Sequence, residues 1–226
     1  MKWCVLVLVF AGLTMGDNAI DTKVFNCPEL NSQDEIDLDK IMGKWYVVEV
    51  LEHRLDLTKS VSGSYVVDSC PIVKLRPLDN AALRLLWTEE SGNVEYFFRI
   101  PDVSRKKGVW RTMVSQNGTL TEKQNYMQFF GSVHVMKAVA SDMVLTFCSR
   151  NPNNQLYSLL LSREHILPKS DKRGVHKLLE RRKLNLVSIR ETCVNGAAGS
   201  RRGALDLVAW AILVGLLTSG VLRSWQ

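Results

Sequence analysis

The stretch IDLDKIMGKWYVVEVL, residues 36–51, opens the part of this chain that we expect to fold. Its second half, Lys44 to Leu51, is the first of a series of short apolar runs that turn residues separate. Short runs of this kind, rich in β-branched and aromatic side chains, predict β-strands. The sequence therefore predicts that the fold begins with this strand.

Seven further strands are predicted after it, separated by turn signals such as Ser91-Gly92-Asn93 and Asn117-Gly118. They cover residues 64–67 continued by 72–75, then 82–88, 94–100, 108–114, 128–137, 142–148 and 155–162. One helix is predicted to follow, from about Asp171, capped by Ser170, to about Lys183. Val175, Leu178 and Leu179 would share its apolar face.

The predicted order of elements indicates an all-β protein with a single C-terminal helix. Eight antiparallel strands in an up-and-down meander can close into a barrel whose interior holds one small ligand. An eight-stranded sandwich is the alternative that the pattern leaves open. The sequence has no internal repeat and no long linker, so we expect one domain, residues 17–195.

The N-terminal segment, residues 1–16, reads as a secretory signal peptide. Lys2 precedes an apolar run that ends in small residues, and the run is too short to span a membrane. Thr14 and Gly16 would occupy the −3 and −1 positions of the cleavage site.

The C-terminal segment, residues 196–226, reads as a GPI-anchor signal that is removed on maturation. Asn195 would be the attachment residue, since small residues follow it, then a polar spacer and a terminal apolar tail. A retained transmembrane helix is the rival interpretation, but the apolar run from Leu207 to Leu222 is shorter than the ~20 residues that cross a bilayer. We therefore expect the protein on the extracellular face of the plasma membrane.

The net charge of +6 is misleading for the folded part of the chain. The two terminal segments hold four basic residues and one acidic residue, so half of the net charge lies outside residues 17–195. No nucleic-acid partner is expected. Basic residues at 172–183 would form a solvated helix face, with contact to anionic lipid headgroups as the alternative.

Four cysteines, Cys27, Cys70, Cys148 and Cys193, lie within the predicted domain. An even number in a secreted chain predicts two disulfides, for which spacing alone allows three connectivities. Asn117-Gly118-Thr119 is an N-glycosylation sequon on a predicted turn.

Several of these motifs together resemble the lipocalin family, closest in form to its apolipoprotein D-like branch. Gly43-Lys44-Trp45 matches the family's Gly-x-Trp at the start of the first strand, and Cys27-Pro28 matches the lead-in of that branch. The resemblance implies that Arg163, just after the last strand, stacks on Trp45. A guanidinium over an indole contributes about 1 kcal/mol or more when partly buried.

The resemblance also implies disulfides Cys27–Cys148 and Cys70–Cys193. Lazarillo-type proteins are similar lipocalins with a GPI anchor, which matches the C-terminal signal expected here. One motif departs from the family: its Thr-Asp-Tyr ahead of the seventh strand is Ser141-Asp142-Met143 in this chain.

Alternation of side chains along the strands predicts which residues line the barrel. The position of Arg163 fixes which side chains of the last strand point into the barrel: those of Tyr157, Leu159 and Leu161. The same rule gives Val94, Tyr96, Phe98 and Ile100 in one strand, and Leu83, Leu85 and Trp87 in another. The candidate ligand-binding residues are Leu85, Trp87, Tyr96, Phe98, Tyr157 and Leu159. A lumen filled by these side chains is the alternative.

Enzyme motifs are missing from the sequence. It has no nucleophile elbow, no zinc-protease motif and no phosphate-binding glycine-rich loop. The histidines have no metal-ligand spacing, and His134 is expected to pack in the fold or face the lumen rather than hold a haem. The free-thiol chemistry of a few lipocalins is not expected, because all four cysteines have predicted partners. No enzyme activity, cofactor or metal is expected.

The hypothesis is therefore a GPI-anchored extracellular lipocalin that binds a lipid, sterol, retinoid or tetrapyrrole non-covalently. The alternative is a cell-surface recognition protein whose loops contact another extracellular protein, as Lazarillo-like proteins suggest in neural development.

Overall fold

A computed structural model describes residues 27–33, 35–54, 63–67, 69–149 and 155–194. The predicted signal peptide, the predicted GPI signal and the predicted attachment residue Asn195 lie outside these residues. Among the described residues, no helix is long and apolar enough to cross a membrane.

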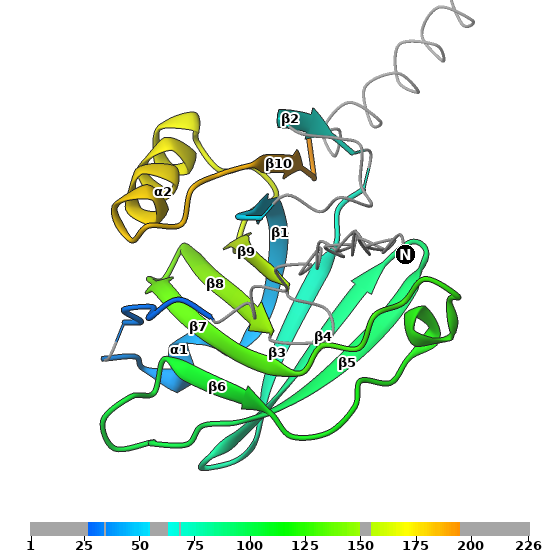
Figure 1. Cartoon of the computed structure of the whole chain (residues 1–226), viewed down its shortest axis with the longest axis vertical. Coiled ribbons are helices and arrows are strands. Elements are labelled where there is room, and N and C mark those ends of the chain that lie inside the picture. Colours follow the sequence, from blue (N-terminus) through cyan, green and yellow to red (C-terminus); the bar gives the residue numbers. More distant parts are fainter. Residues whose placement is uncertain (1–26, 34, 55–62, 68, 150–154, 195–226) are drawn as a thin grey trace, which may run out of the picture.

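The fold is a closed barrel of eight antiparallel strands with one long helix against its outer wall (Figure 1). The elements are α1 (Leu38–Ile41), β1 (Gly43–Glu52), β2 (Gly63–Val66), β3 (Ile72–Asp79), β4 (Ala82–Glu89), β5 (Gly92–Arg99), β6 (Val109–Thr112), the 3₁₀ turn η1 (Thr119–Glu122), β7 (Gly131–Ala138), β8 (Asp142–Ser149), β9 (Leu156–Ser162), α2 (Lys169–Arg181) and β10 (Ser188–Glu191).

The barrel closes because β1 pairs with both its neighbour β3 and the last barrel strand, β9. From β3 to β9, neighbouring strands in the sequence are also neighbours in the sheet, which is an up-and-down meander. The pairing of β1 with β9 leaves no free edge between them, which excludes the sandwich. The up-and-down barrel predicted from the sequence is confirmed.

Two short strands lie beside the barrel and differ from the prediction. Residues 64–67 do not continue into 72–75; they form β2, which pairs in parallel with β10. The missed strand β10 pairs with β1 at residues 49–52, beyond the point where β3 leaves β1. β10 thus extends the sheet along the same edge of β1, and Figure 1 shows both short strands at one end of the barrel.

The strand predicted at 128–137 begins later, at Gly131. The side chain of Gln116 accounts for this, because it takes the place of a partner strand for Phe129. Its amide nitrogen donates to the Phe129 carbonyl at 2.7 Å, and its amide oxygen accepts from the Phe129 N–H at 2.6 Å. Residues 128–130 are therefore held by a side chain rather than by a strand ladder.

The helix α2 begins and ends two residues before the predicted limits. Its first N–H groups, of Asp171 and Lys172, donate to the Pro168 carbonyl at 3.0 and 3.1 Å, so Ser170 is not the cap. Lys183 has φ 61°, a left-handed conformation that stops the helix. The predicted apolar face is correct: Val175 and Leu179 are buried and Leu178 packs beside them.

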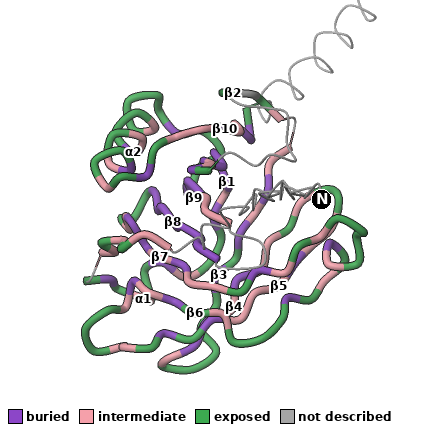
Figure 2. The backbone as a smooth tube through the Cα atoms, viewed as in Figure 1, coloured by how far each residue is buried: buried purple, intermediate pink, exposed green. Residues whose placement is uncertain are grey.

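The protein has two hydrophobic cores, one inside the barrel and one between the barrel wall and α2. A β-bulge between Val47 and Glu49 separates them on β1. Val47 and Val50 face the lumen, whereas Val48 and Leu51 face α2. Figure 2 shows the result, with buried residues along the strands and an exposed outer face on α2.

Candidate functional site

One end of the barrel is closed by Trp45 and Arg163. Trp45 is fully buried, and its indole N–H donates to the Ile41 carbonyl at 2.8 Å. The Arg163 guanidinium lies 3.6 Å from the centre of the indole ring. It also donates to the carbonyls of Lys40 and Met42 at 2.9 and 2.8 Å. The stacking implied by the resemblance is therefore present.

Gly43 is required at this closed end. Its φ of +94° is strained for residues with a side chain, and a Cβ there would lie 3.5 Å from the Arg163 guanidinium. Gly43, Trp45 and Arg163 thus form one structural unit that seals the barrel.

The opposite end of the barrel contains a cavity of about 300 Å³. Five of the six candidate ligand-binding residues line it. The complete lining is Val50, Glu52, Leu85, Trp87, Val94, Tyr96, Leu120, Tyr126, Phe147, Tyr157, Leu159 and Arg190. The lumen is therefore filled at the closed end and hollow at the open end.

Phe98 is the candidate residue that does not line the cavity. It points into the barrel as alternation predicts, but it is fully buried. Its ring lies 6.2 Å from that of Trp110 and 6.4 Å from that of Phe147, measured between ring centres. The side chain therefore belongs to the packed core below the cavity, a depth that alternation alone does not reveal.

Stacked aromatic rings form one wall of the cavity. The rings of Phe147 and Tyr157 are nearly parallel, with centres 4.9 Å apart. Tyr96 meets Phe147 edge-on at 6.1 Å. Aromatic pairs at these separations stabilise each other beyond the burial of their area.

The cavity's polar groups are tyrosine hydroxyls and two charged side chains. Burial, together with the neighbouring Tyr157 and Tyr126, raises the pKa of Tyr96, and burial raises the pKa of Tyr157. Both phenols are therefore neutral at physiological pH and able to donate hydrogen bonds. Glu52 and Arg190 contribute the charges, one from β1 and the other from β10.

The segment that carries Leu120 and Tyr126 is fixed to β5 at the mouth of the cavity. Glu95 N–H donates to the Asn117 carbonyl at 2.8 Å, and Asn93 N–H donates to the Thr119 hydroxyl at 2.9 Å. Asn117 is exposed, as the predicted sequon requires. The glycan itself stays a prediction.

Several cavity residues were not identified from the sequence. Val50 and Glu52 follow the bulge in β1, which reverses the alternation counted from Trp45. Arg190 lies on β10, a strand too short to recognise. Phe147 could have been found, because alternation from Leu145 along the buried strand β8 places it inside.

The four cysteines form the disulfides Cys27–Cys148 and Cys70–Cys193, the pairing that the resemblance implies. The first attaches the N-terminal lead-in to β8. The second attaches the residue after β10 to the segment before β3. These bonds leave no free thiol among the described residues.

The described histidines form no metal centre, and no metal-binding group of residues occurs in the described part of the chain. His134 faces the outside of the barrel, not the lumen, because its neighbours Val133 and Val135 point inward. Burial and the nearby Arg111 lower its pKa.

His53 is buried under the outer layer of the barrel. One ring nitrogen, Nδ1, lies 3.1 Å from the Asn185 carbonyl, and Nε2 lies 2.7 Å from the Ser158 hydroxyl. Since a carbonyl only accepts, Nδ1 carries the proton. Burial lowers the pKa of His53 to about 4.

A larger hollow, about 1040 Å³, lies outside the closed end. It is lined by charges of both signs, among them Asp37, Asp79, Arg105 and Lys107. Its mixed polar lining and open position make it a surface depression, whereas the lumen cavity has the apolar walls typical of ligand sites.

The structure is similar to solved lipocalin-fold proteins. A biogenic amine-binding protein and the tryptamine complex of the amine binding protein of Rhodnius prolixus each match with a TM-score of 0.50 and 12% identity. The match covers 71% of this chain and 83% and 82% of theirs. The siderocalin Ex-FABP matches with a TM-score of 0.42 and 15% identity over 65% of this chain and 89% of its own.

No family model and no curated protein sequence matches the chain. At this level of identity the structural matches establish the fold alone. The two matches at a TM-score of 0.50 agree with the closed eight-stranded barrel observed here. The chain has the lipocalin fold.

Proposed function

We propose that this protein captures a small hydrophobic molecule, non-covalently, in the open end of its barrel. The observation that carries the proposal is the cavity of about 300 Å³ with its apolar and aromatic walls. A filled core would leave no such space, because protein interiors are close-packed. The amine-binding proteins similar in fold support a small-molecule ligand without identifying it.

The size of the cavity favours a compact ligand. Its volume lies at the lower end of the ~300–1,000 Å³ range of small-molecule pockets. One or two fused rings, or a short acyl chain, would be enclosed between Trp87, Tyr96 and Tyr157. A sterol, retinoid or tetrapyrrole from the set expected above would extend through the mouth.

A matched pair of variants tests this function. Leu85 and Leu86 are neighbours on β4; Leu85 lines the cavity, whereas Leu86 faces the outside. We expect the neutral fluorescent probe N-phenyl-1-naphthylamine to bind the native protein and the Leu86→Trp variant. Leu85→Trp should abolish binding while leaving the protein folded. Equal binding by both variants would contradict a lumen site.

Mass spectrometry of the native protein would identify the ligand. A compact apolar molecule should be released on denaturation from the native protein and should be missing from Leu85→Trp.

We further propose that the protein is a GPI-anchored, glycosylated member of the apolipoprotein D-like or Lazarillo-like lipocalins. The support is the sequence of the two termini, the Cys27-Pro28 lead-in and the pairing of the four cysteines. Phosphatidylinositol-specific phospholipase should release it from cells, and peptide N-glycosidase should reduce the mass of the native chain but not of Asn117→Gln. Retention after phospholipase would favour a transmembrane helix.

One observation favours the alternative of surface recognition. Four large apolar side chains between β6 and β7 are exposed: Met113, Val114, Met127 and Phe130. Contact with an extracellular protein would cover them. This alternative gains if N-phenyl-1-naphthylamine does not bind and if Phe130→Ser reduces attachment of the purified protein to cells.

A further inference from the structure

The position of Arg190 on β10 places its side chain at the ligand cavity. Arg190 is directly opposite Val50 in the antiparallel pairing of β10 with β1. Residues opposite each other in such a pair project to the same face of the sheet. Val50 faces the lumen, and both residues line the cavity.

The Arg190 guanidinium has a buried donor atom without an acceptor among the described residues. Its Nε is buried and makes no hydrogen bond. Among the described residues, no carboxylate lies within 4.0 Å of it, although Lys172, Arg84 and Lys137 all have such partners. A buried donor without an acceptor is costly. Arg190 is thus a cation at the lining of an apolar cavity, with one buried donor atom unused.

Glu52, the other charged residue of the lining, differs from Arg190 in this respect. Glu52 already takes part in an interaction of its own. The group that remains to be neutralised at the mouth is therefore the cation. Tyr157 lines the same cavity, and burial raises the pKa of its hydroxyl against the opposing effect of Arg190, so the hydroxyl is neutral.

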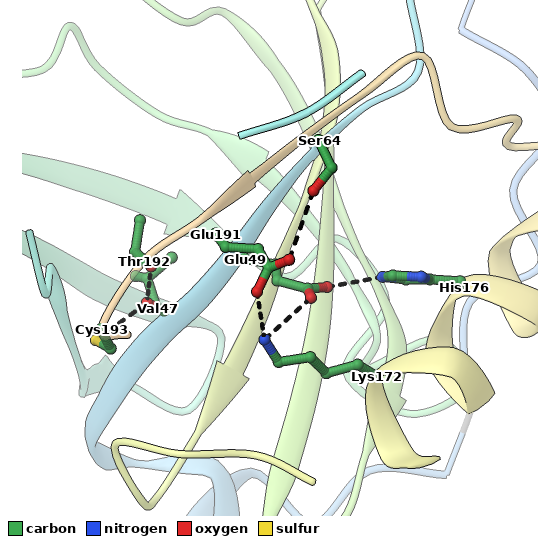
Figure 3. A network of polar contacts seen from close by, with 8 residues as sticks. All are labelled: Val47, Glu49, Ser64, Lys172, His176, Glu191, Thr192 and Cys193. Carbon is green, nitrogen blue, oxygen red and sulfur yellow. Dashed lines mark hydrogen bonds and ion pairs between the residues drawn. The ribbon is translucent and has the colours of Figure 1, made fainter. Parts of the chain in front are cut away.

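The strand that carries Arg190 is fixed on both sides (Figure 3). Glu191 pairs with Lys172 of α2 at 3.1 Å, and Lys172 also reaches Glu49 at 3.3 Å. His176 lies 2.7 Å from the same Glu49 carboxylate. This network attaches β10 to the helix and to β1.

Further contacts continue beyond Glu191. The Thr192 hydroxyl donates to the Val47 carbonyl, and Cys193 is bonded to Cys70. Arg190 thus projects from a backbone that is fixed before any ligand binds, which lowers the entropy cost of binding.

We propose that Arg190 binds the anionic group of the ligand, and that the ligand is a compact hydrophobic acid with its carboxylate at the mouth. This inference rests on the proposed lumen site and specifies the class of molecule that it takes. A guanidinium suits a carboxylate because its N–H groups can pair with both oxygens. The aromatic walls around Trp87 and Tyr157 would enclose the apolar body.

Three probes with one body and different headgroups test the proposal: 2-naphthaleneacetate, 2-naphthaleneacetamide and 2-(2-naphthyl)ethylamine. By calorimetry on the full protein, the acid should bind at least ~10-fold more tightly than the amide. Only the acid can form a hydrogen bond between two charged groups with Arg190. The amine should bind most weakly.

Variants of two arginines assign this preference. Arg190→Gln should weaken binding of the acid to the level of the amide and change the amide by less than about threefold. Arg190→Lys should retain part of the preference. Arg99→Gln, on the outer face of β5, is the matched control and should bind all three probes like the native protein. Circular dichroism and thermal melting verify that each variant is folded.

The outcomes separate the two proposals. Equal affinity for acid and amide, or a preference for the acid that survives in Arg190→Gln, would overturn the role of Arg190 while leaving the lumen site intact. If the amine binds most tightly and Glu52→Gln loses this binding, the site takes a cationic ligand through Glu52 instead. If neither these probes nor N-phenyl-1-naphthylamine bind, the lumen site itself is refuted.

Discussion

The two ends of the barrel use similar residue types in opposite ways. At the closed end the Arg163 guanidinium stacks on the Trp45 indole, and both groups donate hydrogen bonds to nearby carbonyls. At the open end an indole and a guanidinium, Trp87 and Arg190, lie around a cavity, and the guanidinium has a buried donor without a partner.

This difference distinguishes residues that build the fold from residues available for binding. Contacts that hold a protein together leave few polar groups unpaired, since each unpaired group is costly. A group left unpaired at a cavity indicates a place where a ligand completes the structure. Residue type alone does not reveal the distinction.

The largest expected effect is at the closed end. Trp45→Ala should lower the free energy of unfolding by about 3–5 kcal/mol, because it creates a cavity in a fully buried site. Trp87→Ala, at the partly exposed cavity wall, should cost no more than about 2 kcal/mol. Urea denaturation measures both. Equal losses would contradict the contrast between the ends.

A second comparison uses the arginines. Arg163→Met should lower the free energy of unfolding by about 2–3 kcal/mol, since the contact with Trp45 and several charged hydrogen bonds are lost. Arg190→Gln should change it by less than about 0.5 kcal/mol, because no ion pair with a described carboxylate is lost and Nε has no acceptor among these residues. A large destabilisation by Arg190→Gln would show that the open end also depends on its arginine for folding.

Acid should destabilise the open end through His53, which directly follows β1. Its folded pKa of about 4 lies below the ordinary value of 6.5, so the unfolded state binds the proton more tightly. Stability from this histidine is complete above pH 6.5 and is lost as the pH falls toward 4. Between pH 7 and pH 5 the loss should be about 2 kcal/mol.

Urea denaturation at the two pH values measures this effect against His53→Gln, which does not titrate. The variant should lose less stability than the native protein over this interval. An equal loss of unfolding free energy between pH 7 and pH 5 in the two proteins would exclude His53 as the cause.

The strand that begins at the closed end was predictable from the sequence, because it depends on local spacing, whereas the contact of Arg163 with Trp45 was implied by the resemblance to lipocalins. Gly43, Trp45 and the strand they open lie within one short stretch, and the phase of β9 follows from Arg163. Alternation also placed Leu85, Tyr96 and Tyr157 on the inner face correctly. The cavity could not be predicted, since alternation gives the direction of a side chain but not its depth. Phe98 and Tyr96 differ only in that respect.

The missed part of the site depends on irregular pairing. The bulge near Val48 directs the Glu52 side chain toward the mouth of the cavity. Strand β10 brings Arg190 to the same place, although Arg190 is 138 residues after Glu52 in the sequence. No local pattern encodes such a contact. The disulfide Cys70–Cys193, which the resemblance implied, indicated that the C-terminal segment returns to the barrel.

A ligand site at the open end can be tested directly by ¹⁹F NMR of the protein labelled with 5-fluorotryptophan, with each resonance assigned by a Trp→Phe variant. On addition of N-phenyl-1-naphthylamine, the Trp87 resonance should shift, whereas those of Trp45 and Trp110 should stay in place. Shifts at Trp45 with none at Trp87, or no shift at saturating probe, would contradict a ligand site at the open end of the barrel.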